Sequence, residues 1–430
     1  MKDLKRSVSV QVIDSDFALL LPNGIYEIKQ MEPRSRLRSV IVICIFLAVS
    51  GIIGFGYFCP DQVCALSNRE SVVSYQSDGL GKPLPSGWVN AKAGLSYEEV
   101  LHDDFSFDID AHDVMVFLHI QKTGGTSFGR HLVHDLDLKR PCSCQKRRKR
   151  CFCFRPHSDQ NWLFSRYTTG WRCGLHADWT ELTNCVDGVL DQLEGHEAKR
   201  RYFYITLLRE PVARYLSEYR HVQRGATWKG SRHMCKGRVP SVQELPPCYT
   251  DSSWYGVELD DFADCTSNLA GNRQTRMLSD LELVGCYNTT YMPAAERDHV
   301  LLASAKRNLA AMAYFGLTEY QKISQYIFEE TFNLRFAIPF EQNNATVSSV
   351  TMSTLTTAQA AKVSHLNALD IELYAYAKKL LFQRFEKLKS RDSDFKTRFE
   401  HLGELPTKPG VTGFDWDNLL EDTTPNSNVP

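Results

Sequence analysis

One stretch of the chain, residues 114–130, restricts the fold more than any other. It reads VMVFLHIQKTGGTSFGR, and its first half is almost wholly apolar and partly β-branched. Such a run is typical of a strand buried on both faces of a parallel sheet. The second half supplies a cation, two glycines and three hydroxyls, and an amphipathic helix with Phe128, Leu132 and Val133 on one side follows. The stretch predicts a strand, a glycine turn and a helix N-terminus.

This arrangement is suited to holding a phosphate. Glycines let backbone N–H groups approach an anion, and the helix dipole and Lys122 add positive potential. A tight turn with an exposed lysine is the structural alternative. The residue order excludes a Walker A loop, because in GxxxxGK[ST] the lysine follows the glycines, whereas Lys122 precedes Gly124 here.

A lysine-first loop resembles the 5′-phosphosulfate loop of sulfotransferases that use 3′-phosphoadenosine 5′-phosphosulfate (PAPS). The segment HIQKTGGTSFGRHL, with the later LLREPVARYLSEYRH and GLHADWTEL, resembles the heparan sulfate 6-O-sulfotransferase family. The resemblance runs from about Val114 to about Thr346. It implies that Lys122 also serves catalysis, by stabilising the leaving group. The residues expected to hold the donor are His119, Ile120, Gln121, Lys122, Thr123, Gly124, Gly125, Thr126 and Ser127.

Size and composition limit the size of the core, the kind of anion site and the compartment of the protein. With 430 residues and 43% hydrophobic content, the chain can bury one large core or two modest ones. The net charge of −1 means that any anion site must be local. Thirteen cysteines indicate an oxidising compartment.

The N-terminal part predicts a membrane anchor. Residues 1–39 form a polar tail, and residues 40–58 are 19 residues without a charge, about enough to span a bilayer core of roughly 30 Å. Arginines precede this run, which places the tail in the cytoplasm and the bulk of the chain in the lumen. The run begins too late and is too long for the alternative of a cleaved signal peptide. Its glycines and arginine border argue against a buried core helix. Residues 59–105 predict a luminal stem.

A basic run, QKRRKR, lies between two CxC units at residues 142–144 and 151–153. We expect disulfides rather than a zinc site, because structural zinc favours CxxC-type spacing and a secretory lumen favours disulfides. Flanking disulfides would hold Lys149 and its neighbours in place. A fixed cationic patch suits a sulfated or carboxylated polysaccharide, whereas a solvated loop is the alternative.

Aromatic residues are dense in the segment RYTTGWRCGLHADWTEL. Trp171 and Trp179 suit stacking on sugar rings. The resemblance implies that His176 is the general base, and an imidazole can take a proton from a primary hydroxyl near neutral pH. His119, at the end of the first strand, is the alternative base.

Two carboxylates near His176, those of Asp178 and Glu181, could orient its imidazole. A satisfied structural histidine is the alternative reading for His176 itself.

A second apolar strand, residues 201–209, is followed by a helix over residues 212–221. The carboxyl edge of an open α/β sheet is where ligands bind. The resemblance assigns Arg209 and Ser217 to the 3′-phosphate of the donor, which a guanidinium and a hydroxyl can clamp. A salt bridge from Arg209 to Glu210 or Glu218 is the alternative.

Downstream, His221 and Trp228 resemble the acceptor-contacting positions of the family. Six further cysteines indicate disulfides whose pairing cannot be deduced from sequence; they are Cys173, Cys185, Cys235, Cys248, Cys265 and Cys286.

The segment FEQNNATVSS resembles a late cofactor loop, which assigns Asn344, Ala345 and Thr346 to the donor. Asn344 also begins an N-glycosylation sequon, as does Asn288, and a glycan on Asn344 would exclude the donor contact. We expect the donor contact.

The C-terminal part predicts further elements. We expect a helix at residues 303–311, a core strand at 312–317 and a helix at 319–332. A single long helix is expected over 357–389, where leucines and aromatics recur at helical spacing. Residues from about 391 to 430 are polar and are expected to be disordered.

The chain is thus predicted to carry an α/β catalytic domain over residues 106–390, with a P-loop-like parallel sheet flanked by helices, on a single-pass type II anchor in the Golgi membrane. The resemblance implies sulfuryl transfer from PAPS to the 6-hydroxyl of glucosamine in heparan sulfate. No metal constellation is visible, and neither a metal nor a nucleic acid partner is expected. A Golgi sulfotransferase for another glycan position and a non-catalytic glycan-binding protein are the alternatives. The sequence leaves the oligomeric state open.

Overall fold

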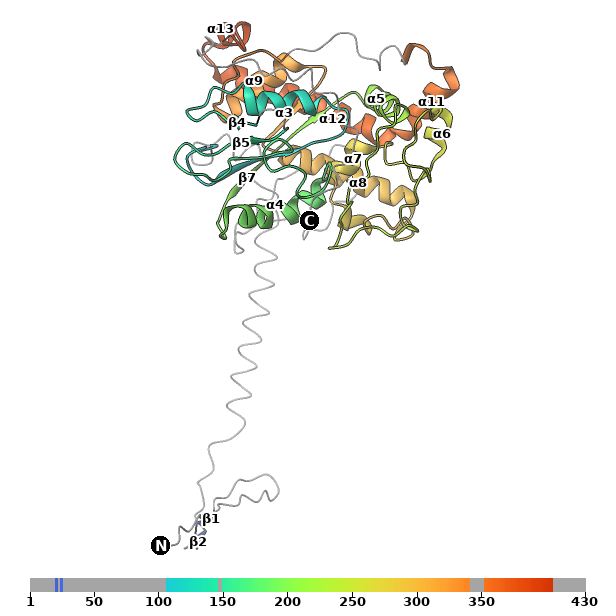
Figure 1. Cartoon of the computed structure of the whole chain (residues 1–430), viewed down its shortest axis with the longest axis horizontal. Coiled ribbons are helices and arrows are strands. Elements are labelled where there is room, and N and C mark those ends of the chain that lie inside the picture. Colours follow the sequence, from blue (N-terminus) through green and yellow to red (C-terminus); the bar gives the residue numbers. More distant parts are fainter. Residues whose placement is uncertain (1–19, 22–23, 26–105, 146–148, 341–351, 405–430) are drawn as a thin grey trace, which may run out of the picture. The chain divides into compact units, whose positions relative to one another are not determined.

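The computed structural model describes residues 20–21, 24–25, 106–145, 149–340 and 352–404 (Figure 1). The chain divides into two units, residues 1–84 and 85–430. The described residues of the first unit form a two-stranded antiparallel sheet, β1 (Leu20–Leu21) and β2 (Gly24–Ile25).

The expected tail, membrane span and stem lie almost wholly outside the described residues. Of the helices that the structure describes, none is long and apolar enough to cross a membrane.

The second unit is built on a four-stranded parallel sheet in the order β6-β3-β7-β8. Its strands are β6 (Leu163–Phe164), β3 (Asp113–Leu118), β7 (Arg201–Leu208) and β8 (Tyr314–Leu317). The β3 residue Val116 lies opposite Phe164 on one side and Tyr204 on the other. The predicted parallel sheet is confirmed, and the three predicted strands form β3, β7 and β8.

Helices cover both faces of the sheet (Figure 1). On one face lie α3 (Gly125–His134) and α9 (Gln321–Phe332). On the other lie α4 (Trp179–Glu194) and α8 (Ala294–Ala311). A further helix, α12 (Ala368–Arg391), contacts β8, α8 and α9. The α/β architecture with a parallel sheet flanked by helices is therefore confirmed.

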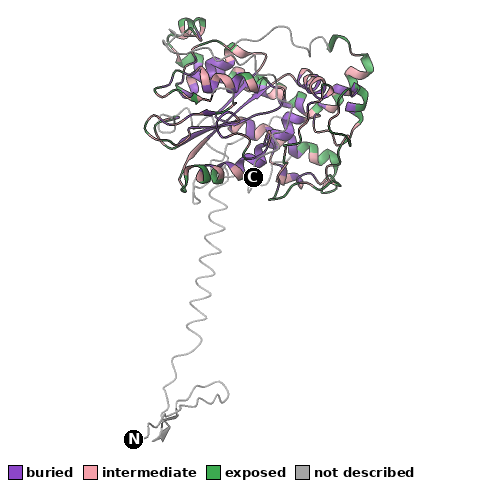
Figure 2. Cartoon of the chain, viewed as in Figure 1, coloured by how far each residue is buried: buried purple, intermediate pink, exposed green. Residues whose placement is uncertain are grey.

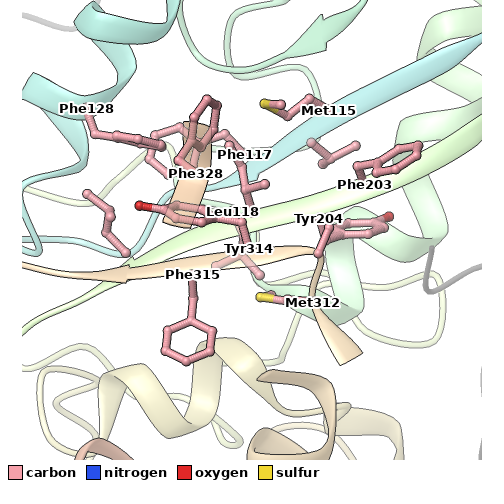
Figure 3. Packing of buried hydrophobic residues seen from close by; sticks show 14 of the residues in the cluster. Met115, Phe117, Leu118, Phe128, Phe203, Tyr204, Met312, Tyr314, Phe315 and Phe328 are labelled. Carbon is pink, nitrogen blue, oxygen red and sulfur yellow. The ribbon is translucent and has the colours of Figure 1, made fainter. Parts of the chain in front are cut away.

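The core follows the sheet, as the buried residues in Figure 2 show. Every residue of β3 is buried, as expected of a strand that is apolar on both faces. In Figure 3, Phe117, Phe128 and Phe328 gather on one face, and Met312 and Phe315 lie on the other.

Smaller elements surround the sheet. They are β4 (Ser143–Cys144), β5 (Cys151–Phe152), α5 (Pro211–Gln223), α6 (Leu259–Asp264), α7 (Arg273–Leu278) and the 3₁₀ helix η2 (Leu281–Val284). All cysteines of the described residues are in disulfides, which confirms the disulfide prediction and excludes the zinc alternative. The pairs are Cys142–Cys153, Cys144–Cys151, Cys173–Cys185, Cys235–Cys286 and Cys248–Cys265.

The prediction of one helix over residues 357–389 is wrong. The segment forms α11 (Thr357–Leu366) and α12, with a break at the buried Asn367. The Asn367 side-chain amide donates to the carbonyl oxygen of Val363 at 2.8 Å. This bond competes with continuation of the helix, as asparagine side chains commonly do.

The expectation of disorder from residue 391 is also wrong for the described part of that segment. Residues 395–400 form α13 (Phe395–Glu400). The rings of Phe395 and Phe399 lie 5.3 and 5.7 Å from that of Tyr326 on α9. These two aromatic residues were the sequence signal for packing. Residues 405–430 lie outside the described part.

Candidate active site

The turn after β3 lies at the carboxyl edge of the sheet and leads directly into α3. Lys122 and Gly124 have left-handed φ angles of 66° and 82°. Gly124 has no Cβ to strain this conformation, whereas Lys122 adopts it with a side chain. Within the described residues, no side chain caps the N-terminus of α3, and its first turn holds no acidic residue. The first N–H groups of α3 are thus suited to an anion.

Neighbouring strand ends hold this turn in place. The guanidinium of Arg209, directly after β7, donates to the carbonyl oxygen of Lys122 at 3.2 Å. Thr318, directly after β8, places its hydroxyl 2.7 Å from the carbonyl oxygen of Thr123. The Thr123 hydroxyl in turn donates to the Ile120 carbonyl at 3.0 Å. The structure therefore brings the predicted donor loop and Arg209 together.

Arg209 is fixed through its backbone. Its N–H donates to Gln274 Oε1, and its carbonyl accepts from Gln274 Nε2, both at 2.9 Å. Burial lowers the pKa of Arg209 from its ordinary value. The carboxylates considered as its ion-pair partners have other contacts: Glu210 caps α5, and Glu218 binds two other arginines. Ser217 lies on α5 and is half-buried.

His176 is tied to the donor loop. Its Nδ1 lies 2.9 Å from the carbonyl oxygen of His119, and the two rings lie 4.7 Å apart. Because a carbonyl oxygen only accepts, Nδ1 carries the proton of the neutral ring. Nε2 is then an unprotonated acceptor, the state that a general base requires.

Burial lowers the pKa of His176 to about 3, although its bond to the His119 carbonyl acts in the opposite direction. The positive charge of Arg166 adds to the lowering. Burial likewise lowers the pKa of His119, to well below its ordinary value. Both imidazoles are therefore neutral near pH 6–7.

The expectation that Asp178 or Glu181 orients His176 is wrong. The Asp178 side chain accepts from the Glu181 N–H at 2.9 Å, and the Glu181 side chain accepts from the Asp178 N–H at 3.1 Å. This reciprocal pair is the capping box of α4. Both carboxylates are used to begin the helix, and a backbone carbonyl orients the histidine.

A small pocket lies between the two histidines and is lined in part by Phe117, Arg166 and Trp171. The Trp171 ring lies 4.7 Å from that of His176. Arg166 lies 5.5 Å over the Trp171 ring, and its guanidinium donates to the Thr126 hydroxyl at 3.3 Å. Arg166 therefore joins the pocket to the first turn of α3. Sequence reasoning missed Arg166, because no spacing pattern marked it.

Of two further predicted residues, Trp228 lies beside His176 and His221 lies beside Trp228. The Trp228 ring lies 5.4 Å from the His176 ring and 5.5 Å from the His221 ring. His221 belongs to α5, and Trp228 lies in the loop beyond it. Trp171 and Trp228 thus lie beside the candidate base, and His221 contacts Trp228.

Trp179, in contrast, does not belong to the site. It is 2% exposed, and its ring lies 5.1 Å from that of Tyr204 in the core. The expected sugar contact is wrong because the first turn of α4 directs this side chain beneath the sheet.

The remaining predicted positions are Lys149 and the late loop. Lys149 is half-buried at the tip of the hairpin formed by β4 and β5, and residues 146–148 beside it lie outside the described residues. Asn344, Ala345 and Thr346 also lie outside them. In the part of the chain that the structure describes, no three His, Cys, Asp or Glu side chains form a metal-binding group.

The fold and the site are those of an α/β group-transfer enzyme, with a turn suited to an anion beside a neutral histidine. A family model described as "Sulfotransferase family" matches residues 105–377. Heparan-sulfate 6-O-sulfotransferase 2 of Gallus gallus is 48% identical over 373 residues, which cover 84% of this chain and 90% of that protein.

Heparan-sulfate 6-O-sulfotransferase 3-B of Danio rerio is 55% identical over 82% of this chain and 87% of its own length. Heparan-sulfate 6-O-sulfotransferase 1 of Homo sapiens is 56% identical over 66% of this chain and 70% of its own length. The chain belongs to the sulfotransferase family, and within it to the heparan-sulfate 6-O-sulfotransferases. The resemblance seen in the sequence is confirmed.

Proposed function

We propose that this protein transfers a sulfuryl group from PAPS to the 6-hydroxyl of glucosamine residues in heparan sulfate. The observation that carries the proposal is the bond from His176 Nδ1 to the His119 carbonyl, because it sets a neutral base against the loop that would hold the donor. The names and identities of the relatives support the acceptor assignment.

The residues at the carboxyl edge of the sheet fit such a donor. The uncapped N-terminus of α3 and Lys122 suit its 5′-phosphosulfate, and Arg209 with Ser217 suits its 3′-phosphate. His119 Nδ1 and Gln121 Oε1 are buried and have no hydrogen-bond partner among the described residues, so the loop has polar capacity for a ligand. The donor would supply an activated sulfuryl group.

On the acceptor side, His176 Nε2 takes the proton of the attacking hydroxyl as its oxygen bonds to sulfur. Lys122 and the N–H groups of α3 neutralise the negative charge that develops on the leaving phosphate oxygen. The Trp171 and Trp228 rings lie beside the base, which suits a sugar. Arg166 adds a positive charge at the pocket for an anionic acceptor.

The double-disulfide hairpin would extend the acceptor surface. Cys142–Cys153 and Cys144–Cys151 fix the strands on both sides of the basic run that contains Lys149. Cations held in this way lose little entropy when they bind a polyanion.

We also propose that the enzyme is a single-pass type II protein of the Golgi membrane with its catalytic domain in the lumen. The arginines before the apolar run at residues 40–58 support this orientation. The five disulfides fit an oxidising compartment.

The proposal is tested by sulfate transfer from labelled PAPS to desulfated heparan sulfate, with the full-length protein and disaccharide analysis of the product. We expect label on the 6-position of glucosamine. Label at another position would overturn the acceptor assignment and leave the donor assignment standing. Acceptor binding without donor binding or transfer would identify a glycan-binding protein instead.

A further inference from the structure

A buried carboxylate lies on α5 immediately after Ser217. The Glu218 side chain is 1% exposed and receives N–H groups from three residues. Arg214 donates to Oε2, Arg273 donates to both oxygens, with Nε 2.8 Å from Oε2, and Trp228 Nε1 donates to Oε1 at 3.0 Å. The carboxylate thus joins α5, the start of α7 and the loop that carries Trp228.

The two arginines hold Glu218 ionised and in place. Burial acts to raise the pKa of Glu218, but the charges of Arg273 and Arg214 outweigh it and bring the pKa to about 2. Arg214 also donates to the carbonyl oxygen of Ala270, so its own position is fixed. A carboxylate bound by two buried guanidinium groups has little freedom to rotate. The orientation of the indole that donates to this carboxylate is therefore restricted as well.

Trp228 needs such an anchor. No helix or strand is described between α5, which ends at Gln223, and α6, which begins at Leu259. Backbone hydrogen bonds hold this loop near Trp228, among them that from the Ser231 N–H to the Trp228 carbonyl at 2.9 Å, and the bond to Glu218 fixes the indole N–H itself. The indole plane stands at 86° to the His176 ring, at a centroid distance of 5.4 Å.

We propose that Glu218 is a positioning residue that fixes the Trp228 indole beside His176 and so preforms the acceptor-binding face. This inference rests on the proposed function, because it takes Trp228 to contact the sugar. A preset ring spares the acceptor the entropy of ordering that side chain on binding.

The same scaffold reaches the donor side. Arg273 binds Glu218, and the next residue, Gln274, binds the backbone of Arg209. The N–H groups of Gln274 and Thr275 donate to Asp370 on α12 at 3.0 and 2.7 Å. The start of α7 therefore supports the acceptor side through Arg273 and the donor side through Gln274. A test of the inference must separate effects on acceptor binding from effects on donor binding.

The test replaces Trp228 in the full-length protein with benzothienylalanine, which keeps a bicyclic ring and lacks the N–H group. A Trp228→Phe variant is measured beside it, and Trp254→Phe, in the separate cluster around Phe262, is the matched control. Calorimetry gives Kd for a heparan hexasaccharide and for adenosine 3′,5′-bisphosphate, and transfer of labelled sulfate gives kcat and KM.

We expect the acceptor Kd to rise about tenfold in both Trp228 variants, the effect of one hydrogen bond to a charged group. The nucleotide Kd should stay within about twofold, and the control should match the wild type. An unchanged acceptor Kd for the benzothienylalanine protein would overturn the inference. Equal weakening of acceptor and nucleotide would also overturn it, because that result indicates a general structural role.

The outcome separates this inference from the proposed function. If the wild type binds the hexasaccharide and the variants show the expected split, but no sulfate is transferred, the proposed function fails and the positioning role stands. If the wild type does not bind the hexasaccharide, the positioning role fails with it.

Discussion

The Nδ1 atom of His176 donates to the carbonyl oxygen of His119, the residue that follows strand β3. The proposed base is therefore oriented by the backbone of the proposed donor loop rather than by a carboxylate. A change that moves the loop would therefore alter the hydrogen bond that orients His176.

Replacing the candidate base should remove turnover and spare donor binding. We expect His176→Ala to lower kcat by about 10²–10⁴-fold, the range for loss of a general base. The Kd for adenosine 3′,5′-bisphosphate should stay near the wild-type value in calorimetry. The exposed His196→Ala is the matched control. If His119→Ala abolishes transfer while His176→Ala does not, the base has been misassigned.

Lys122 is expected to act mainly in the transition state. We expect Lys122→Ala to lower kcat by about 10²-fold or more, because charge on the leaving oxygen loses its cationic partner. Single-turnover sulfate transfer measures the effect. Lys139→Ala, on an exposed side chain outside the site, should leave the rate unchanged. Full activity in Lys122→Ala would contradict the scheme.

The stability of the fold should fall with acid because of buried neutral histidines. His119 is 6% exposed, and burial lowers its pKa well below the unfolded value of about 6.5. At a pH between the folded and unfolded pKa values, His119 is protonated in the unfolded chain and neutral in the folded one. The contribution of His119 to the free energy of unfolding is therefore present above about pH 6.5 and is lost below it. His119 therefore contributes to a loss of stability as the pH falls through about 6.5.

Denaturant unfolding at pH 7.5 and 5.5 measures this loss. We expect His119→Gln to lose less free energy of unfolding than the wild type between the two pH values, because the variant lacks the buried neutral imidazole. An identical loss in both proteins would assign the acid sensitivity to other groups.

Position 125 requires glycine because its backbone lies close to the His119 ring. A Cβ at Gly125 would lie 2.4 Å from His119 Cδ2 and 3.1 Å from Phe117 Cζ. We expect Gly125→Ala to cost about 1–3 kcal/mol of stability and to lower kcat, because the ring must shift. A Cβ at Gly188 on α4 would meet nothing within 4 Å, so Gly188→Ala should stabilise by up to about 1 kcal/mol. Thermal unfolding of the two variants distinguishes these effects, and equal Tm values would contradict the steric argument.

Asp370, which lies on α12, caps the N-terminus of α7. It is fully buried and accepts from the N–H groups of Gln274 and Thr275. We expect Asp370→Ala to cost about 2–3 kcal/mol, since it removes the cap and leaves buried N–H groups unpaired. Donor affinity should also fall, because Gln274 holds Arg209. Asp394→Ala, at an exposed N-cap without a side-chain cap bond, is the control. Unaltered unfolding of Asp370→Ala in urea would refute the role.

Much of the site could be predicted from the sequence, because its signals are local. The apolar run of β3, the glycine turn and the start of α3 lie within one short segment, and the β7 strand and Arg209 within another. Parallel pairing of β3 with β7 then brings the two strand ends to one edge. The cysteine spacing and redox compartment likewise indicated disulfides, although not their pairing.

Other features depend on contacts between residues far apart in the chain. Trp171 and Trp179 are the same residue type and lie in the same segment of the sequence. Trp171 nevertheless lines the pocket, whereas Trp179 belongs to the core because α4 turns its side chain beneath the sheet. Likewise, no sequence pattern links Glu218 to Trp228 and Arg273.

The sequence by itself determined the strand, the glycine turn before a helix, the arginine at the next strand end and the family, because residue type and spacing are sufficient for these. The tertiary structure alone decided that a backbone carbonyl orients His176, and that Asp178 and Glu181 cap α4 instead. Hydrogen bonds of this kind depend on the distance and direction between atoms that only folding brings together.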